Sequence, residues 1–182
     1  MKKILILNGS PRIKGNTSCL IKAFEEGAIE KGNEVKTFNL GRMKIHGCLG
    51  CFGGGKNSEC PCVQKDDMNQ IYPYFKEADV IVLASSLYYW TISSQLKIVL
   101  DRLFAIEELD KTLARGNKSV VLLMAGAGGD FEATEYWFNA FSRHMNWNIL
   151  GKVLVGGVHD IGDINKKKDE LNSAYTLGNS IK

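Results

Sequence analysis

The sequence has no long hydrophobic run, only three prolines and no large excess of one charge. No stretch reaches the roughly 20 apolar residues that a membrane helix needs. The apolar run at 3–7 is too short for a signal peptide and is typical of a strand, so we expect a cytoplasmic protein without a membrane partner. Its 23 basic and 20 acidic residues give a net charge of +3. Such a balance does not favour the clustered basic face of a nucleic-acid-binding protein.

Histidine is also scarce, and the five cysteines are unevenly placed. His46, His144 and His159 share no ligand spacing such as H-x-x-x-H, so we predict that they are not catalytic. In a cytoplasmic protein, cysteines are more often thiols, metal ligands or redox groups than structural disulfides. Cys19 falls within a predicted helix, where we expect a core thiol.

Apolar runs typical of strands alternate with helix-like stretches along the whole chain. The predicted strands cover residues 3–7, 34–40, 79–84, 119–125 and 149–155. The predicted helices cover 17–31, 66–76 with Asp66 as N-cap, 93–107, 131–145 and the tail from about 165. Continuous apolar strands separated by helices indicate a parallel sheet covered on both faces, a three-layer α/β/α sandwich. We therefore predict one α/β domain over 1–182, doubly wound in the strand order 2-1-3-4-5, with a cysteine-containing insertion at about 41–65.

The loop after the first predicted strand, GSPRIKGNTS at 9–18, is rich in hydrogen-bond donors. In doubly wound folds, ligands bind beyond the carboxyl ends of the strands, which selects the loops 9–17, 85–92 and 126–131. The start of a helix presents free N–H groups that favour an anion. An Asn/Thr-capped turn is the alternative, but the number of converging donors favours a phosphate site. Its predicted residues are Ser10, Arg12, Gly15, Asn16, Thr17 and Ser18.

Other phosphate loops match this segment less well. A P-loop needs a lysine after its second glycine, where this chain has Asn16. A dinucleotide fingerprint needs G-x-G-x-x-G and an acid at the end of the second strand, which ends here in Asn39-Leu40. No cysteine is followed six residues later by arginine, as a cysteine phosphatase would require. The comparison favours a mononucleotide.

Three segments together resemble one known group of proteins. They are GSPR-x-x-GNTS at 9–18, HGCLGC at 46–51 followed by DDM at 66–68, and LASSLYYWTISSQLKIVLDRL at 83–103. They are similar to the NAD(P)H-dependent FMN reductase and iron–sulfur flavoprotein group of the flavodoxin-like superfamily. The resemblance implies flavin mononucleotide (FMN) as cofactor and NADH or NADPH as transient donor. It also implies a quinone, nitro compound, flavin or protein as acceptor, and a homodimer or larger homo-oligomer.

The second and third loops are expected to surround the flavin ring. Tyr88, Tyr89 and Trp90 follow a buried strand and can cover a flat ring, although packing in a subunit interface is an alternative or additional role. Glycines after the fourth strand allow close approach of the backbone, or simply a flexible turn. Ser86 stands where the family usually has proline. The predicted residues are Ser85, Ser86, Leu87, Tyr88, Tyr89, Trp90, Gly126 and Gly128.

The four cysteines between positions 48 and 62 leave alternatives open. Cys48, Cys51, Cys60 and Cys62 could ligate a [4Fe-4S] cluster or zinc. The resembled iron–sulfur flavoproteins carry C-x2-C-x2-C-x4–7-C, and Gly54 occupies the third cysteine position of that run. We therefore predict thiols or a reversible disulfide in preference to a metal site.

Together these features predict an FMN-dependent NAD(P)H oxidoreductase. The flavin brings the redox chemistry, so no catalytic side chain is predicted. The alternatives are a flavodoxin-like or iron–sulfur flavoprotein electron carrier without small-molecule turnover, and a non-redox binding module on the same fold. The net charge of +3 disfavours a flavodoxin-type carrier, which is usually acidic.

Overall fold

The computed structural model describes all 182 residues and contains one five-stranded sheet in the order β2-β1-β3-β4-β5. All four pairs of neighbouring strands are parallel, which confirms the predicted sheet and its doubly wound order. The strands are β1 (Lys3–Asn8), β2 (Glu34–Asn39), β3 (Val80–Ser86), β4 (Ser119–Ala125) and β5 (Asn148–Val155).

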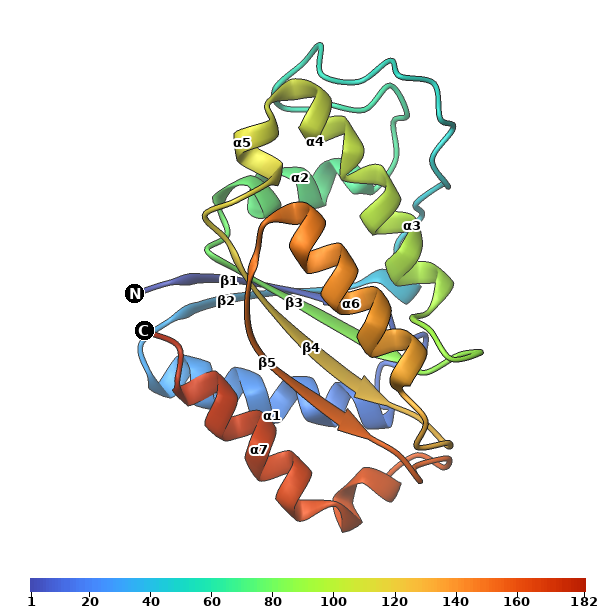
Figure 1. Cartoon of the computed structure of the whole chain (residues 1–182), viewed down its shortest axis with the longest axis vertical. Coiled ribbons are helices and arrows are strands. Elements are labelled where there is room, and N and C mark those ends of the chain that lie inside the picture. Colours follow the sequence, from blue (N-terminus) through green and yellow to red (C-terminus); the bar gives the residue numbers. More distant parts are fainter.

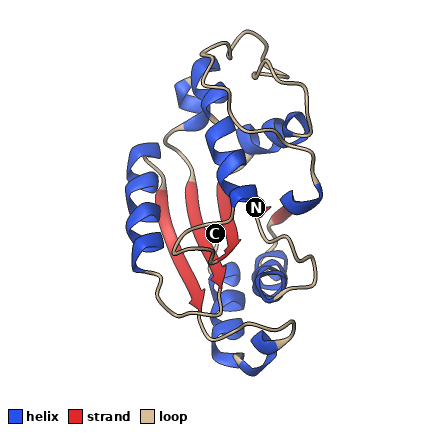
Figure 2. Cartoon of the chain, turned by 90° about the vertical axis from the view of Figure 1, so that its right-hand side faces the viewer, coloured by secondary structure: helices blue, strands red, loops and turns tan.

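Helices cover both faces of the sheet, as Figures 1 and 2 show. One face carries α1 (Asn16–Glu30) and α7 (Lys168–Asn179), which pack against each other. The other face carries α2 (Met68–Glu77), α3 (Ser94–Arg102), α4 (Phe104–Leu109), α5 (Lys111–Ala114) and α6 (Glu132–Met145). Two short 3-10 helices, η1 (Leu40–Arg42) and η2 (Asp163–Lys166), lie in connections. No helix is both long and apolar enough to cross a bilayer.

The two faces of the sheet pack into two separate hydrophobic clusters. In β1, Leu5 and Leu7 belong to the cluster under α2 and α3, whereas Ile4 and Ile6 belong to the cluster under α1. Successive strand side chains point to opposite faces, and both faces are covered here. This is why the central strands β1, β3 and β4 read as continuous apolar runs and not as alternating ones.

The helices differ from the prediction mainly around α2 to α5. The predicted helix 93–107 is interrupted at Leu103, and α5 was not predicted. Helix α2 begins at Met68 after Asp67, so Asp66 is not its N-cap residue. The Asp66 carboxylate accepts a hydrogen bond from the Met68 N–H and is also bound by Arg102, a distant partner that the local pattern does not reveal.

Candidate functional site

A cavity of about 250 Å³ lies at the carboxyl edge of the sheet, where the phosphate loop, residues 9–18, meets the loops after β3, β4 and β5. Nine of its lining residues were predicted for the cofactor: Ser10, Arg12, Gly15, Asn16, Thr17, Ser86, Leu87, Tyr88 and Gly126. The others are Ala125, Ala127, Val158 and His159. Val158 and His159 follow β5, whose loop carried no phosphate pattern in the sequence.

Three hydroxyl groups, two from the phosphate loop and one from the end of β3, converge in this cavity. The Ser86 Oγ donates to Ser10 Oγ at 3.3 Å and lies 3.5 Å from Thr17 Oγ1. Ser10 and Thr17 are almost completely buried. Gly15 stands at the N-cap of α1, and no side chain caps that helix. The Ser18 N–H donates to the Gly15 carbonyl, which leaves the N–H groups of Asn16 and Thr17 for a ligand. Hydroxyls and a helix N-terminus together form a site for an anion.

Two predicted phosphate ligands also hold a neighbouring loop in place. The Asn16 Oδ1 accepts hydrogen bonds from the N–H groups of Gly162 and Ile164, and its Nδ2 donates to the Asp160 carbonyl. The Arg12 guanidinium donates to the His159 carbonyl at 3.3 Å. Both side chains therefore fasten the loop after β5 onto the phosphate loop.

Five predicted ligands do not line this cavity: Tyr89, Trp90 and Gly128 line a neighbouring hollow, and Ser18 and Ser85 line neither. The Ser18 Oγ donates to the Arg12 carbonyl. The buried Ser85 Oγ donates to the Ser86 carbonyl and accepts from the Ser93 N–H. Ser93 in turn caps α3 and donates to the Gly9 carbonyl at 2.7 Å. A Cβ at Gly9 would lie 2.6 Å from Ser93 Oγ, so this position needs glycine. Ser85 and Ser93 brace the loops, and Ser93 was not predicted.

The aromatic loop after β3 forms a tight turn beside the cavity. Tyr88 and Thr91 exchange two backbone hydrogen bonds of 3.0 Å. Tyr89 and Trp90 have φ values of 46° and 61°, a left-handed conformation that is unfavourable for bulky residues. The Trp90 Nε1 donates to Asp130, and the Trp90 carbonyl accepts from Thr134, so α6 and the loop before it hold the turn.

A shallow hollow of about 510 Å³ adjoins the anion cavity and shares Leu87 with it. Its other lining residues are Tyr89, Trp90, Gly128, Gly129 and Asp130. A Cβ at Gly126 would lie 2.8 Å from Leu87 Cβ, which shows how closely the two loops approach. An anion cavity next to a hollow with aromatic walls fits a flavin mononucleotide, which has a phosphate at one end and a flat ring at the other.

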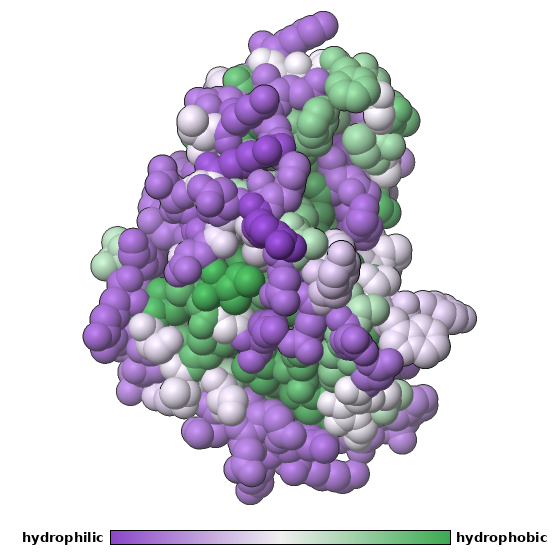
Figure 3. Space-filling view, viewed as in Figure 1, coloured by the Kyte–Doolittle hydropathy of each residue, from purple (hydrophilic) through white to green (hydrophobic).

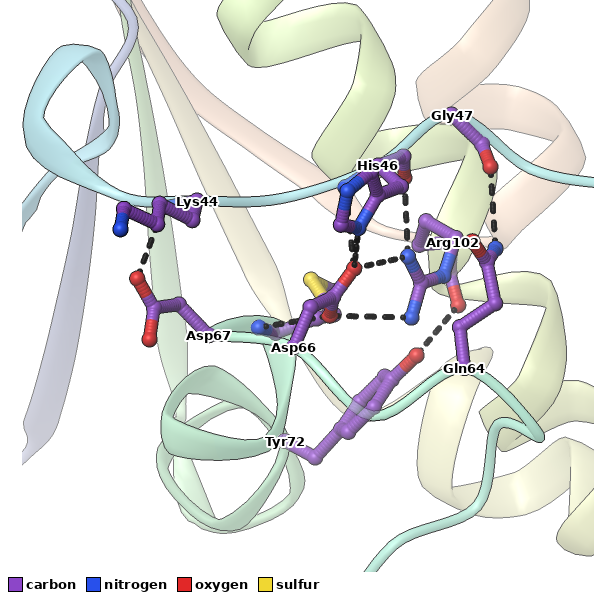
Figure 4. Close-up of polar contacts among 9 residues, drawn as sticks. Lys44, His46, Gly47, Gln64, Asp66, Asp67, Tyr72 and Arg102 are labelled. Carbon is purple, nitrogen blue, oxygen red and sulfur yellow. Dashed lines mark hydrogen bonds and ion pairs between the residues drawn. The ribbon is translucent and has the colours of Figure 1, made fainter.

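The Cys segment, which we define as residues 43–65, forms no helix or strand and is anchored at both ends (Figure 4). The fully buried Arg102 donates to both Asp66 carboxylate oxygens and to the His46 carbonyl. Burial alone would raise the pKa of Asp66. The Arg102 hydrogen bond and the N–H groups of His46 and Met68 outweigh burial and hold that pKa below its ordinary value. The pair is therefore ionised and ties the segment to α3.

The Cys segment does not fit the cluster arrangement of the resembled iron–sulfur flavoproteins. No three metal-ligating side chains are arranged as a metal site. At the third cysteine position, the Gly54 N–H donates to Glu108 Oε2 at 3.0 Å. A Cβ at position 54 would overlap that oxygen and lie 3.2 Å from the Cα of Ala105. The place of a third thiolate is thus closed by α4.

The chain is similar to flavoproteins in sequence. A family model described as NADPH-dependent FMN reductase matches residues 2–160. An iron-sulfur flavoprotein of Archaeoglobus fulgidus is 31% identical over 185 residues, which cover 100% of this chain and 79% of the relative. One from Methanosarcina thermophila is 29% identical, covering 99% of this chain and 92% of the relative. A Methanocaldococcus jannaschii iron-sulfur flavoprotein is 35% identical over 100 residues, and the match covers only 51% of its length.

Solved structures share the fold at low sequence identity. A NAD(P)H:quinone oxidoreductase from Methanothermobacter marburgensis has a TM-score of 0.70 and 17% identity, and the match covers 98% of this chain and 96% of the other. An FMN-dependent NADH-azoreductase from Bacillus anthracis has a TM-score of 0.69 and 18% identity, with 97% and 99% covered. These likenesses confirm the flavodoxin-like fold.

Proposed function

Because the chain belongs to the NADPH-dependent FMN reductase family, we propose that it carries electrons from NADH or NADPH through FMN to a quinone, nitro compound, flavin or protein. Family membership itself makes the protein an oxidoreductase with FMN as its cofactor. The electron acceptor is proposed in addition, because family membership does not name it. Structures of the same fold include a quinone oxidoreductase and an azoreductase, which supports an aromatic acceptor.

The observation that carries the proposal is the convergence of Ser10, Thr17 and Ser86 at the start of α1. These hydroxyls and the first N–H groups of α1, beside Gly15, would hold the FMN phosphate. Arg12 and Asn16 would act at its mouth, where they also position the loop after β5. Hydrogen bonds to an ionised phosphate are stronger than those between neutral groups, so this end fixes the cofactor.

The turn of Tyr88, Tyr89 and Trp90 and the glycines at 126 and 128 would hold the ring. When bound, FMN supplies hydride acceptance and electron release. The chain's own groups would bind the phosphate and orient the ring through the turn, with Leu87 between the two hollows. We propose no catalytic side chain, since the transfer needs none from the protein. Ser85 acts by bracing the loop, and Ser18 stays outside the cavity.

An electron carrier without small-molecule turnover is the second candidate, since the curated relatives are named iron-sulfur flavoproteins, a name that states no substrate. We further propose a homodimer or larger homo-oligomer in the cytoplasm. Tyr89 and Trp90 are 93% and 57% exposed, which leaves an aromatic surface for another copy to cover. Light scattering on the purified protein measures the oligomeric state directly.

The test is a spectrum and an assay on the purified protein in the absence of air. We expect flavin absorbance after loading with FMN, bleaching by NADPH or NADH, and steady turnover when duroquinone is added. Failure to bind FMN would overturn the proposal. Bleaching without turnover of duroquinone, nitro compounds or free flavin would replace the reductase by the carrier.

A further inference from the structure

A second cavity, of about 450 Å³, lies between the Cys segment and the helices α3 and α4. It shares no residue with the anion cavity, and the two lie near opposite ends of α3. The nine residues of α3 span about 13 Å at 1.5 Å per residue. We propose that this second cavity binds a small aromatic molecule without negative charge. The proposal stands apart from FMN binding and goes beyond it.

The walls of the cavity gather large apolar side chains that are open to solvent. Phe52 is 79% exposed, Leu49 68% and Phe104 41%. The rings of Phe52 and Phe104 meet edge to face at 5.7 Å. Green surface collects at the upper right of Figure 3, over α4 and the Cys segment. Such a concave apolar patch of ligand-like volume is typical of a small-molecule site, and its aromatic walls favour an aromatic guest.

The charged groups at the cavity disfavour an anion. Glu108 and Asp101 both line it. The nearby cations are each paired with a carboxylate, the buried Arg102 with Asp66 and Lys97 with Asp101. A ligand therefore meets the Glu108 carboxylate, which forms no ion pair, and no free cation. An anionic ligand would be repelled, whereas a neutral or cationic ring is tolerated.

The cavity is preformed because both ends and the middle of the Cys segment are fastened. Arg102 holds Asp66 and the His46 carbonyl at the ends, as Figure 4 shows. Glu108 holds the Gly54 N–H in the middle, which glycine permits because it has no Cβ. A fixed cavity binds without the cost of ordering a loop.

The cysteines supply an internal control. Cys48, Cys51 and Cys62 line the cavity, whereas Cys60 does not. Cys48, Cys51 and Cys60 are all exposed to solvent. A bound molecule should therefore shield Cys48 and Cys51 from alkylation by iodoacetamide and leave Cys60 reactive.

The binding test compares two probes that differ by one sulfonate. They are N-phenyl-1-naphthylamine, which is neutral, and 8-anilinonaphthalene-1-sulfonate, which is an anion. In equilibrium dialysis against protein saturated with FMN, we expect one neutral molecule per chain and binding of the anion weaker by about tenfold or more. Displacement by excess FMN, binding without saturation, or equal affinity for both probes would overturn the proposal.

Variants locate the bound molecule. Phe52→Ala should weaken binding of the neutral probe about tenfold, since it removes an aromatic wall that contacts the ring of the probe. Tyr136→Ala, which removes an exposed aromatic ring on α6, should leave it unchanged. Glu108→Gln should reduce the difference in affinity between the neutral and the anionic probe. Equal effects of the Phe52 and Tyr136 variants would contradict the site.

Site-specific alkylation followed by mass spectrometry gives the second readout. Slower modification of Cys48 and Cys51 with an unchanged rate at Cys60 supports the proposal. Equal protection of all three cysteines from alkylation, or no protection of any of them, would overturn the proposal. Flavin absorbance is measured in every variant, so a failure of FMN binding is seen separately from a failure of this cavity.

Discussion

The phosphate loop and the Cys segment both meet α3, but they are held by different kinds of interaction. Ser93 at the start of α3 braces the phosphate loop through a neutral hydrogen bond to Gly9 and is itself held by a second one to Ser85 of β3. Arg102 at its end holds the Cys segment through a buried ion pair with Asp66. A loop whose donors are consecutive in sequence can be recognised locally, whereas a segment shaped by one distant charge cannot.

The largest expected effect comes from removing the charge that holds the Cys segment. Arg102→Met keeps much of the side-chain volume but leaves Asp66 buried without its partner. We expect the free energy of unfolding to fall by about 3–5 kcal/mol. Urea denaturation measures it, with Lys97→Ala as control, because the exposed Lys97–Asp101 pair contributes at most about 0.5 kcal/mol. Similar losses in both variants would remove the distinction between buried and exposed anchors.

Lys118 provides a reference at the opposite edge of the sheet, away from both loops. Burial lowers the pKa of Lys118 to about 8. Below that pH the folded and unfolded states both hold the proton; above it only the unfolded state does, up to its ordinary value of 10.5. Stability should therefore rise with pH across this window, by up to about 1.4 kcal/mol per pH unit.

Urea denaturation at pH 7, 9 and 10 compares the wild-type protein with Lys118→Met. We expect the free energy of unfolding of the wild-type protein to rise relative to that of Lys118→Met as the pH rises through this window, because the variant lacks this titrating group. FMN affinity should be equal in the two proteins at each pH. A difference in stability that does not depend on pH would contradict the lowered pKa of Lys118.

Gly54 tests the contact between the Cys segment and α4. Gly54→Ala places a methyl group against Glu108 and 3.2 Å from the Cα of Ala105, so we expect a loss of about 1–3 kcal/mol in stability. Gly47→Ala is the matched control in the same segment, since a Cβ there meets no atom within 4 Å. Thermal denaturation compares them, and FMN affinity should be unchanged in both. Equal stability of the two variants would mean that position 54 is open.

The smallest expected effect concerns the phosphate loop. Thr17→Val preserves the shape of the side chain and removes a hydroxyl that faces the cavity. We expect the dissociation constant of FMN to rise about tenfold, the scale of one hydrogen bond to a charged group. Thr112→Val removes a hydroxyl that bonds Asp110 at the surface and should leave FMN binding unchanged. Fluorescence titration of free FMN measures both, and unaltered affinity in Thr17→Val would place the phosphate elsewhere.

The sheet and its strand order could be predicted because they follow from patterns along the chain. The central strands β1, β3 and β4 are apolar runs buried on both faces, and the helices alternate with the strands. The phosphate loop was recognisable for the same reason, since Ser10, Gly15 and Thr17 lie within a few residues. The start of a predicted helix beside these residues completed the pattern of a phosphate site.

The parts that could not be predicted depend on contacts between distant residues. Asp66 bonds Arg102 across 36 positions, and Gly54 bonds Glu108 across 54. Neither pairing has a local pattern, so the start of α2 and the second cavity were not foreseen. Val158 and His159 were also not predicted. They line the anion cavity because Asn16 and Arg12 hold their loop beside it through hydrogen bonds.

The central claim is that the converging hydroxyls at the start of α1 bind the phosphate of FMN. Parallel titrations with FMN and with riboflavin, which lacks the phosphate, test it most directly. We expect FMN to bind more tightly by about a hundredfold or more, because the cavity is built for an anion. Equal affinity for the two flavins would contradict the claim.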